Sequence, residues 1–148
     1  MFQHILVPTD GSELSDLAVR RAISFAKAGG SKVTFFFARP NTAASPYGET
    51  ALFRSMDPNI YQDVVTKQAN EVLDRASSLA KEAGIEFDSL STASNGEPYE
   101  EIVATASGKG CDMILMASHG YQGIKGLLLG SQTQKVLTHS KIPVLVYR

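Results

Sequence analysis

The stretch MILMASHGYQGIKGLLLGSQTQKVL, residues 113–137, passes from an unbroken apolar run through four glycines into an amphipathic segment. Its first four residues, Met113–Met116, form a short apolar run of the kind that is typical of a strand buried inside a sheet. The spacing over Ser131–Thr138 predicts a short helix with Val136 and Leu137 facing the core. A buried strand, a glycine loop and a helix in this order indicate an α/β fold.

The amino-terminal part of the chain shows the same order of strand, loop and helix. Ile5–Val7 is a short apolar run that ends at Pro8, and turn residues then precede a predicted helix over Glu13–Lys27. Apolar residues recur along this helix at spacings of three and four: Leu14, Leu17, Ala18, Ala22, Phe25 and Ala26. Gly29–Gly30 is a helix stop, and Val33–Ala38 predicts a strand covered on both faces.

A long connection separates this half from the rest of the chain. Residues 41–56 show no sustained period, so we expect a surface loop that serves as a lid or a partner surface. Asp57–Pro58 resembles a helix cap followed by a first-turn proline, and the helix that it opens ends at Gly84. An imperfect alternation over Ile85–Ser91 then predicts an edge strand.

The carboxyl-terminal elements complete a regular alternation of strands and helices. Pro98 opens a third helix that ends at Gly108 and Gly110, and Ile142–Tyr147 is the closing strand. Strict alternation favours a doubly wound α/β domain with right-handed crossovers. We therefore predict one domain over residues 1–148: a five-stranded parallel sheet in the order 3-2-1-4-5 with helices on both faces.

The composition excludes several classes of function. The formal net charge is −1 and no basic block is present, so we expect no nucleic-acid partner. Cys111 is the single cysteine, which excludes an internal disulfide framework and a cysteine-based zinc site and fits a reducing cytoplasm. No run approaches the roughly 18 apolar residues of a membrane span, and the amino terminus lacks a signal-peptide pattern. We predict a cytoplasmic protein without a membrane segment.

Two loops lie where ligands usually bind in such sheets, beyond the carboxyl ends of the strands. One is Pro8–Ser12, and the other is the glycine loop that ends at Gly130 and Ser131. Exposed amides and the helix dipole at the start of a helix favour an anion such as phosphate, and glycine lets phosphate oxygens approach the backbone. The alternative is structural: Gly130 permits a turn and Ser131 caps the helix.

Neither loop carries a better-known phosphate motif. Gly-x-x-x-x-Gly-Lys-[Ser/Thr] is absent, and no Gly-x-Gly-x-x-Gly follows the first strand, which argues against a Walker-type hydrolase and a dinucleotide dehydrogenase. Asp10 offers a carboxylate for ribose hydroxyls or for a metal ion carried by phosphates. Capping of the first helix is an equally good account of Asp10 taken alone.

Three segments together resemble the universal stress protein family: ILVPTDGS at 5–12, MASHGYQGIKGLLLGS at 116–131 and IPVLV at 142–146. The resemblance extends over essentially the whole chain. In the ATP-binding branch of that family the loop reads Gly-x2-Gly-x9-Gly-[Ser/Thr]. This sequence has Ala117-x2-Gly120-x9-Gly130-Ser131, so alanine stands at the first glycine position.

The resemblance implies a site for ATP, or for ADP or AMP. At the matching positions Pro8 and Asp10 border adenosine and ribose, Ala38 touches adenine, and Met116 lines the pocket; Thr9, between the first two, is included in the nucleotide site. The residues implied around the phosphates are Ala117, Gly120, Gly130, Ser131 and the backbone of Gln132. Asp10 also helps to hold a divalent cation, Mg or Mn, that arrives with the nucleotide.

Catalysis has less support in the sequence. Ser118 and His119 stand side by side in the loop, but no third residue that would orient them can be identified. We assign no catalytic residue, and we expect ATP hydrolysis to be slow or absent because no dedicated water-activating base is visible.

The closing strand and the loops suggest how such a protein acts. Val144–Val146 is apolar enough to need covering at a sheet edge, and the resemblance implies a two-fold homodimer paired through Ile142–Tyr147. The protein's own helices are the alternative cover. We therefore hypothesise a dimeric stress-response sensor or signalling module that binds ATP, with loops 41–56 and 121–129 ordered by the nucleotide. The competing hypothesis is an interaction protein of the same fold in which Ala117 blocks phosphate.

Overall fold

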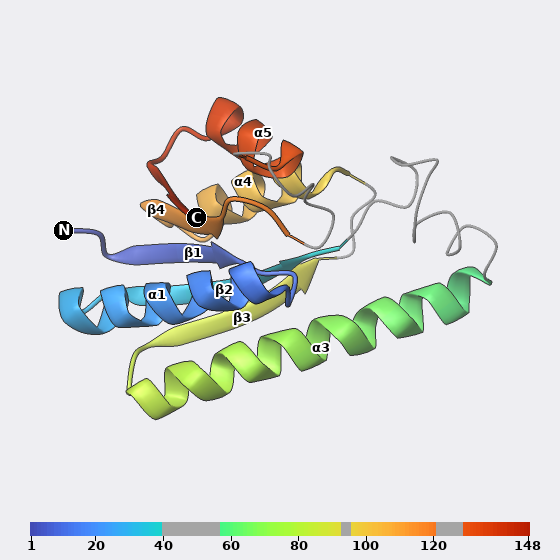
Figure 1. The fold of residues 1–148 in the computed structure, drawn as a ribbon, viewed down its shortest axis with the longest axis horizontal. Helices are drawn as coiled ribbons and strands as arrows, with labels where there is room; N and C mark the ends of the chain where they lie inside the picture. Colours follow the sequence, from blue (N-terminus) through green and yellow to red (C-terminus); the bar gives the residue numbers. More distant parts are fainter. Residues whose placement is uncertain (40–56, 93–95, 121–128) are drawn as a thin grey trace.

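The five strands form one parallel sheet, flanked by four helices in the part of the chain that the computed structural model describes, residues 1–39, 57–92, 96–120 and 129–148 (Figure 1). The elements are β1 (His4–Pro8), α1 (Glu13–Gly29), β2 (Lys32–Ala38), α3 (Pro58–Ala83), β3 (Phe87–Thr92), α4 (Pro98–Gly108), β4 (Met113–Ala117), α5 (Ser131–His139) and β5 (Val144–Tyr147). The strand order is β3-β2-β1-β4-β5, which confirms the predicted order 3-2-1-4-5. The predicted lid at residues 41–56 lies outside the described residues.

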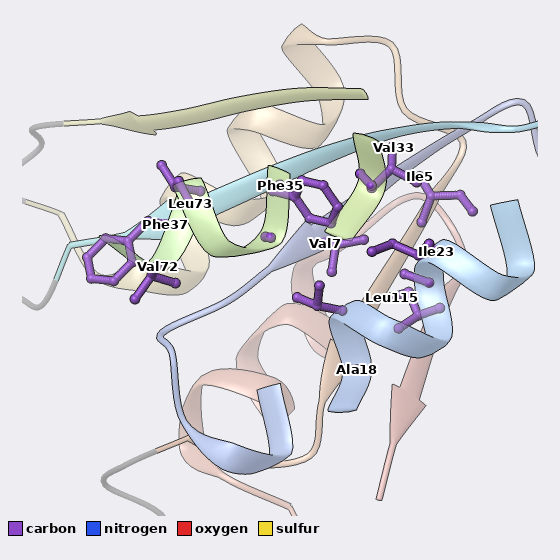
Figure 2. Close-up of a cluster of buried hydrophobic side chains, with 14 of the residues drawn as sticks. Ile5, Val7, Ala18, Ile23, Val33, Phe35, Phe37, Val72, Leu73 and Leu115 are labelled. Atoms are coloured by element: carbon purple, nitrogen blue, oxygen red, sulfur yellow. The ribbon is translucent and has the colours of Figure 1, made fainter. Parts of the chain in front are cut away.

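Helices cover both faces of the sheet. Helices α1 and α3 lie on one face and α4 and α5 on the other (Figure 1). Buried residues of β1 alternate between the two faces, so that Ile5 and Val7 pack in one cluster and Leu6 in the other. We call these the α1/α3 cluster and the α4/α5 cluster. Figure 2 shows the first, in which Val7 and Phe35 meet side chains of the covering helices. Burial on both faces explains why the central strands read as continuous apolar runs.

Local signals define most helix boundaries. The side chain of Ser12 caps α1 by accepting a hydrogen bond from the Ser15 amide (3.3 Å), and Gly30 ends the helix in the left-handed conformation. Helix α3 begins after Asp57, whose Oδ1 accepts the Asn59 amide (2.8 Å), and Pro58 occupies its first turn. These boundaries agree with the sequence prediction to within two residues.

Several predicted core positions are instead on the surface. Leu137 is 41% exposed, whereas its neighbour Val136 is fully buried, because α5 presents one narrow face to the sheet and successive residues point about 100° apart. Leu17 and Phe25 of α1 are also exposed. The buried apolar face of α1 and of α5 is therefore narrower than the sequence pattern predicts.

Two strands begin later than predicted. The amide of Ile85 donates to Ala80 O (3.3 Å), which closes the end of α3, so β3 begins at Phe87 and not at Ile85. Strand β5 begins at Val144 and not at Ile142. Ser140 explains this second shift because its Oγ accepts the Ile142 amide (3.2 Å) and donates to the Ile142 carbonyl (2.8 Å).

Cys111 is a buried part of the α4/α5 cluster. Burial raises the pKa of its thiol to about 11, so the thiol stays protonated at neutral pH. This environment gives Cys111 the properties of a small core residue. Among the helices of the described residues, none has the length and apolar character needed to cross a membrane.

Candidate functional site

The candidate site lies where the two central strands end. Strand β1 pairs with β4 in parallel register, Ile5 with Met113 and Leu6 with Ile114. Both loops that the sequence singled out therefore leave the same edge of the sheet, at its carboxyl side. In parallel sheets this edge is the usual place for a ligand.

Thr9 holds the first loop to the core. Its amide donates to Phe36 O of β2 (2.9 Å), and its hydroxyl hydrogen-bonds with the Ser15 hydroxyl (3.1 Å) and accepts the Gly11 amide (3.3 Å). The residue is 5% exposed. Of the predicted site residues, Thr9 is thus one whose side chain is engaged by the protein itself.

Asp10 does not cap α1, because Ser12 performs that role. Instead Asp10 Oδ1 accepts the Ser12 amide (2.9 Å), which makes the tight turn of the loop. The other carboxylate oxygen, Oδ2, lies against Gly120 of the second loop so closely that a side chain at position 120 would collide with it. The structure therefore brings two predicted site residues, Asp10 and Gly120, into direct contact, and Gly120 is needed for that contact.

Gly130 closes the second loop at its base. Its amide donates to Ser118 O (2.6 Å), and a β-carbon at position 130 would lie 3.2 Å from that oxygen and 3.3 Å from the His119 α-carbon. The Ser118 amide in turn donates to Tyr147 O of β5 (2.8 Å). The chain thus leaves the sheet and returns to it at one point, and α5 begins beside the end of β4.

Helix α5 begins without a side-chain cap. In the described part of the chain its N-cap is Gly130, no side chain caps its first turn, and that turn contains no acidic residue. Ser131 is exposed at the first helical position, and Gln132 follows half-buried. The amides at the start of a helix have no partner within the helix, and the dipole places partial positive charge there. This end of α5 is suited to an anion.

The alanine at the first glycine position does not face α5. Ala117 is 7% exposed, and its methyl group packs in the α1/α3 cluster, whereas α5 covers the opposite face. Met116 is buried in the α4/α5 cluster, and Ala38 packs at the margin of that cluster at the end of β2. Both therefore contribute to the core at the edge where the site lies.

Sequence reasoning missed two residues that shape this site, Ser15 and Thr133, and for Gln132 it assigned a role to the backbone alone. Ser15 is buried and bonds to Thr9, and Thr133 is buried with its hydroxyl donating to Ala117 O (3.0 Å). Gln132 Oε1 accepts the Tyr99 amide of α4 (2.9 Å). A polar residue on the apolar face of a helix is the signal that would have revealed Ser15 and Thr133, but no sequence signal links Gln132 to Tyr99.

Ser118 and His119 are hydrogen-bonded to each other, Oγ to Nδ1, at 3.1 Å. Ser118 is buried and its carbonyl holds Gly130, so this hydroxyl belongs to the base of the loop. Among the described residues there is no group of three or more His, Cys, Asp or Glu side chains that would hold a metal ion. A cation here would need oxygen atoms of its ligand in addition to Asp10.

Comparison with known proteins places this geometry among relatives. The sequence profile of the universal stress protein family matches residues 1–148. Universal stress protein YxiE from Bacillus subtilis is 30% identical over 150 residues, covering 100% of each chain. The solved structure of MJ0577, a universal stress protein from Methanocaldococcus jannaschii, superimposes with a TM-score of 0.82 at 28% identity, over 99% of this chain and 96% of that one. A universal stress protein crystallised in complex with cAMP has a TM-score of 0.72, again at 28% identity, over 99% of this chain and 97% of that one.

Proposed function

Because the chain belongs to the universal stress protein family, we propose that it binds an adenine nucleotide, ATP foremost, at the carboxyl ends of β1 and β4. We propose further that it acts in the cytoplasm as a dimeric stress sensor or signalling module. The observation that carries the proposal is the uncapped start of α5 beside a loop that holds Asp10 against Gly120.

The phosphates occupy the start of α5 in this proposal. The amides after Gly130 donate to phosphate oxygens, and the exposed hydroxyl of Ser131 adds a donor. Adenosine lies toward β1 and β2, bordered by Pro8, Asp10 and Ala38. The relative that binds cAMP supports an adenine nucleotide in general, whereas ATP itself rests on the loop spacing of residues 117–131.

Asp10 has two roles in this proposal. Its carboxylate accepts hydrogen bonds from ribose hydroxyls or contributes one oxygen to a divalent cation. A cation bound with the nucleotide would neutralise charge on the phosphates. The donor set fits such an ion, because a single carboxylate with phosphate oxygens and water is the usual environment of Mg²⁺.

The position of Ala117 favours nucleotide binding over the competing hypothesis. If the methyl group blocked phosphate, it would have to face the start of α5. It packs instead in the α1/α3 cluster, on the other face of the sheet. The alanine therefore leaves the approach to the backbone amides as open as glycine would.

Equilibrium dialysis against ATP with excess Mg²⁺ tests this function. We expect saturable binding of one nucleotide per chain at or below millimolar ATP, weaker binding of AMP, and competition by ADP. Absence of saturable ATP binding at millimolar concentration would refute the nucleotide site and leave the interaction protein as the explanation. A variant with Asp10→Ala should bind ATP more weakly and is the internal control for the location of the site.

We also propose that β5 pairs with the same strand of a second copy. In the described residues β5 pairs only with β4, and Leu145 in its middle is 39% exposed. On the α1 side Arg21 lies over the Tyr147 ring at 5.8 Å, and the exposed Leu17 is one turn away on the same helix face. An exposed apolar strand edge favours pairing with another strand.

Sedimentation velocity tests this pairing. We expect the wild type to sediment as a dimer and the variant Leu145→Lys as a monomer. A wild-type monomer at micromolar concentration would contradict the proposed dimer.

A further inference from the structure

The first turns of α4 and α5 are joined by a side chain. Gln132 Oε1 accepts the backbone amide of Tyr99 at 2.9 Å. Tyr99 is the second residue of α4, so its amide is one of the donors that have no partner within the helix. Because the partner is an N–H group, the amide of Gln132 is fixed with its oxygen toward α4.

A second contact runs beside the first. Lys135 Nζ lies 2.9 Å from Glu97 Oε1 and 2.6 Å from Oε2, at the residue that precedes α4. The same ammonium group lies over the Tyr99 ring at 5.4 Å, and that ring packs against His139 with centroids 4.8 Å apart. Hydrogen bonding to Glu97 raises the pKa of Lys135, so the ammonium group stays charged at neutral pH. Gln132, Lys135 and His139, spaced along the length of α5, thus contact the start of α4.

The opposite side of the first turn of α5 is held to the sheet. The next residue after Gln132, Thr133, donates its hydroxyl to Ala117 O at 3.0 Å and is buried. One residue thus fixes the turn to β4 and its neighbour fixes it to α4. Together with the bond from the Gly130 amide to Ser118 O, these two bonds hold the first turn of α5, whose N-cap residue Gly130 makes no side-chain hydrogen bond to it.

From this geometry we infer that Gln132 is a positioning residue. Its side chain, bonded to α4, orients the first-turn amides of α5 so that they donate to a bound anion. The inference rests on the proposed function and adds to it. The family resemblance assigns only the backbone of Gln132 to the phosphates. In this inference the side chain contributes as well, because its bond to the Tyr99 amide of α4 fixes the first turn of α5. Loss of the bond to Tyr99 would leave α5 folded but change the direction of its amides.

The variant Gln132→Met tests the inference, because methionine keeps the length and helix propensity of glutamine but cannot accept the Tyr99 amide. Its matched control is Gln134→Met, the same change two residues along on the exposed side of α5, where the side chain amide donates to Leu129 O at 3.4 Å and does not bond to α4 in the described part of the chain. Both variants and the wild type are titrated with Mg-ATP and with adenosine. Adenosine lacks phosphate and reports only on the part of the site near β1 and β2.

We expect Gln132→Met to bind ATP about five- to tenfold more weakly, with adenosine binding unchanged. Gln134→Met should match the wild type for both ligands. Lys135→Met, which breaks the ion pair but keeps the Gln132 bond, should lose less ATP affinity than Gln132→Met. Thermal unfolding of each unliganded variant confirms that it is folded.

The outcomes separate the two proposals. If the wild type takes up no ATP, the proposed function fails and the positioning role fails with it. If the wild type binds ATP and Gln132→Met binds it equally well, only the positioning role is refuted. Equal losses of ATP and adenosine would also refute it, because a general loss of structure does not distinguish the phosphate end.

Discussion

Helices α4 and α5 lie side by side, but they begin in opposite ways. Helix α4 carries its own acceptors: Glu100 Oε2 accepts the Glu97 amide (3.0 Å), and Glu100 and Glu101 place two carboxylates in the first turn. Helix α5 begins at Gly130 with neither a side-chain cap nor an acidic residue in its first turn. Carboxylates at a helix start satisfy its amides and repel an incoming anion, so only one of the two ends is suited to phosphate.

The difference has a consequence for folding. A side-chain cap stabilises a helix start, and with glycine at its N-cap α5 forgoes about a few tenths of a kcal/mol of that stability. Packing of Val136 and the bond from Thr133 to Ala117 O hold α5 in its place instead. A position that is poor for folding and good for ligand binding is the pattern expected of a functional site.

The largest expected effect comes from giving α5 the kind of first turn that α4 has. Ser131→Glu places a carboxylate at an exposed position, so packing is unaffected and the helix is slightly stabilised. We expect ATP affinity to fall roughly 10- to 100-fold, because like charges about 5 Å apart near a protein surface repel by about 3 kcal/mol. The measurement is a titration with Mg-ATP at low salt.

Thr138→Glu is the matched control for this charge, because Thr138 is exposed in the last turn of the same helix. It should leave ATP binding within about twofold of wild type. If both variants bind ATP as the wild type does, the phosphates do not lie at the start of α5.

The next largest effect extends the comparison to a third helix, α1, which does have a side-chain cap. Ser12→Ala removes the oxygen that accepts the Ser15 amide, and we expect a loss of about 1 to 2 kcal/mol in the free energy of unfolding. Urea denaturation measures it. Ser24→Ala, an exposed serine inside α1 whose hydroxyl contacts Arg20 O, should change stability by less than about 0.5 kcal/mol. Equal effects of the two changes would show that the cap contributes nothing.

Much of the fold follows from local sequence signals. Apolar runs marked the buried strands, and Gly30 and Gly84 marked helix ends, because both adopt the left-handed conformation that glycine takes up at little cost. Helix faces were less predictable. Leu17, Phe25 and Leu137 match the helical period but lie on the surface, since periodicity does not say how wide a face the sheet covers.

The candidate site was predictable in its loops but not in its contacts. The glycine spacing pointed to Gly120 and Gly130, and the structure shows what each avoids: the carboxylate of Asp10 and the backbone of residues 118–119. Which side of the sheet the methyl of Ala117 faces depends on strand register, which the sequence does not state. The bond between Gln132 and Tyr99 joins residues 33 apart, and no local pattern records it.

Ala117→Gly sharpens the comparison by testing whether the start of α5 is already open. Since the methyl group packs in the α1/α3 cluster, we expect no gain in ATP affinity beyond about twofold. We expect a loss of about 1 kcal/mol in stability, because a buried methyl group is removed and glycine weakens a strand. Parallel ATP titration and urea denaturation measure both. A tenfold or larger gain in ATP affinity would mean that the alanine obstructs phosphate.

The smallest expected effect contrasts the start of α5 with the amino ends of the strands, where polar groups bond to one another. His4 Nε2 lies 2.7 Å from Thr34 Oγ1, and burial together with the nearby charge of Lys32 lowers the His4 pKa from its ordinary value, although Asp88 and Asp112 oppose this. The unfolded chain therefore takes up a proton near pH 6.5 before the folded chain does, so stability falls as the pH drops below that value.

His4→Gln keeps a hydrogen-bonding group toward Thr34 but cannot titrate. We expect the wild type to lose several tenths of a kcal/mol more than this variant between pH 7.5 and about pH 5. Urea denaturation across that range measures the difference, and His139→Gln, at an exposed position of α5, controls for removal of a histidine. A variant whose stability falls as steeply as that of the wild type would show that His4 titrates alike in both states. The hydrogen bond from His4 to Thr34 would then leave the histidine as easily protonated as in the unfolded chain, and His4 would contribute nothing to the pH dependence of stability.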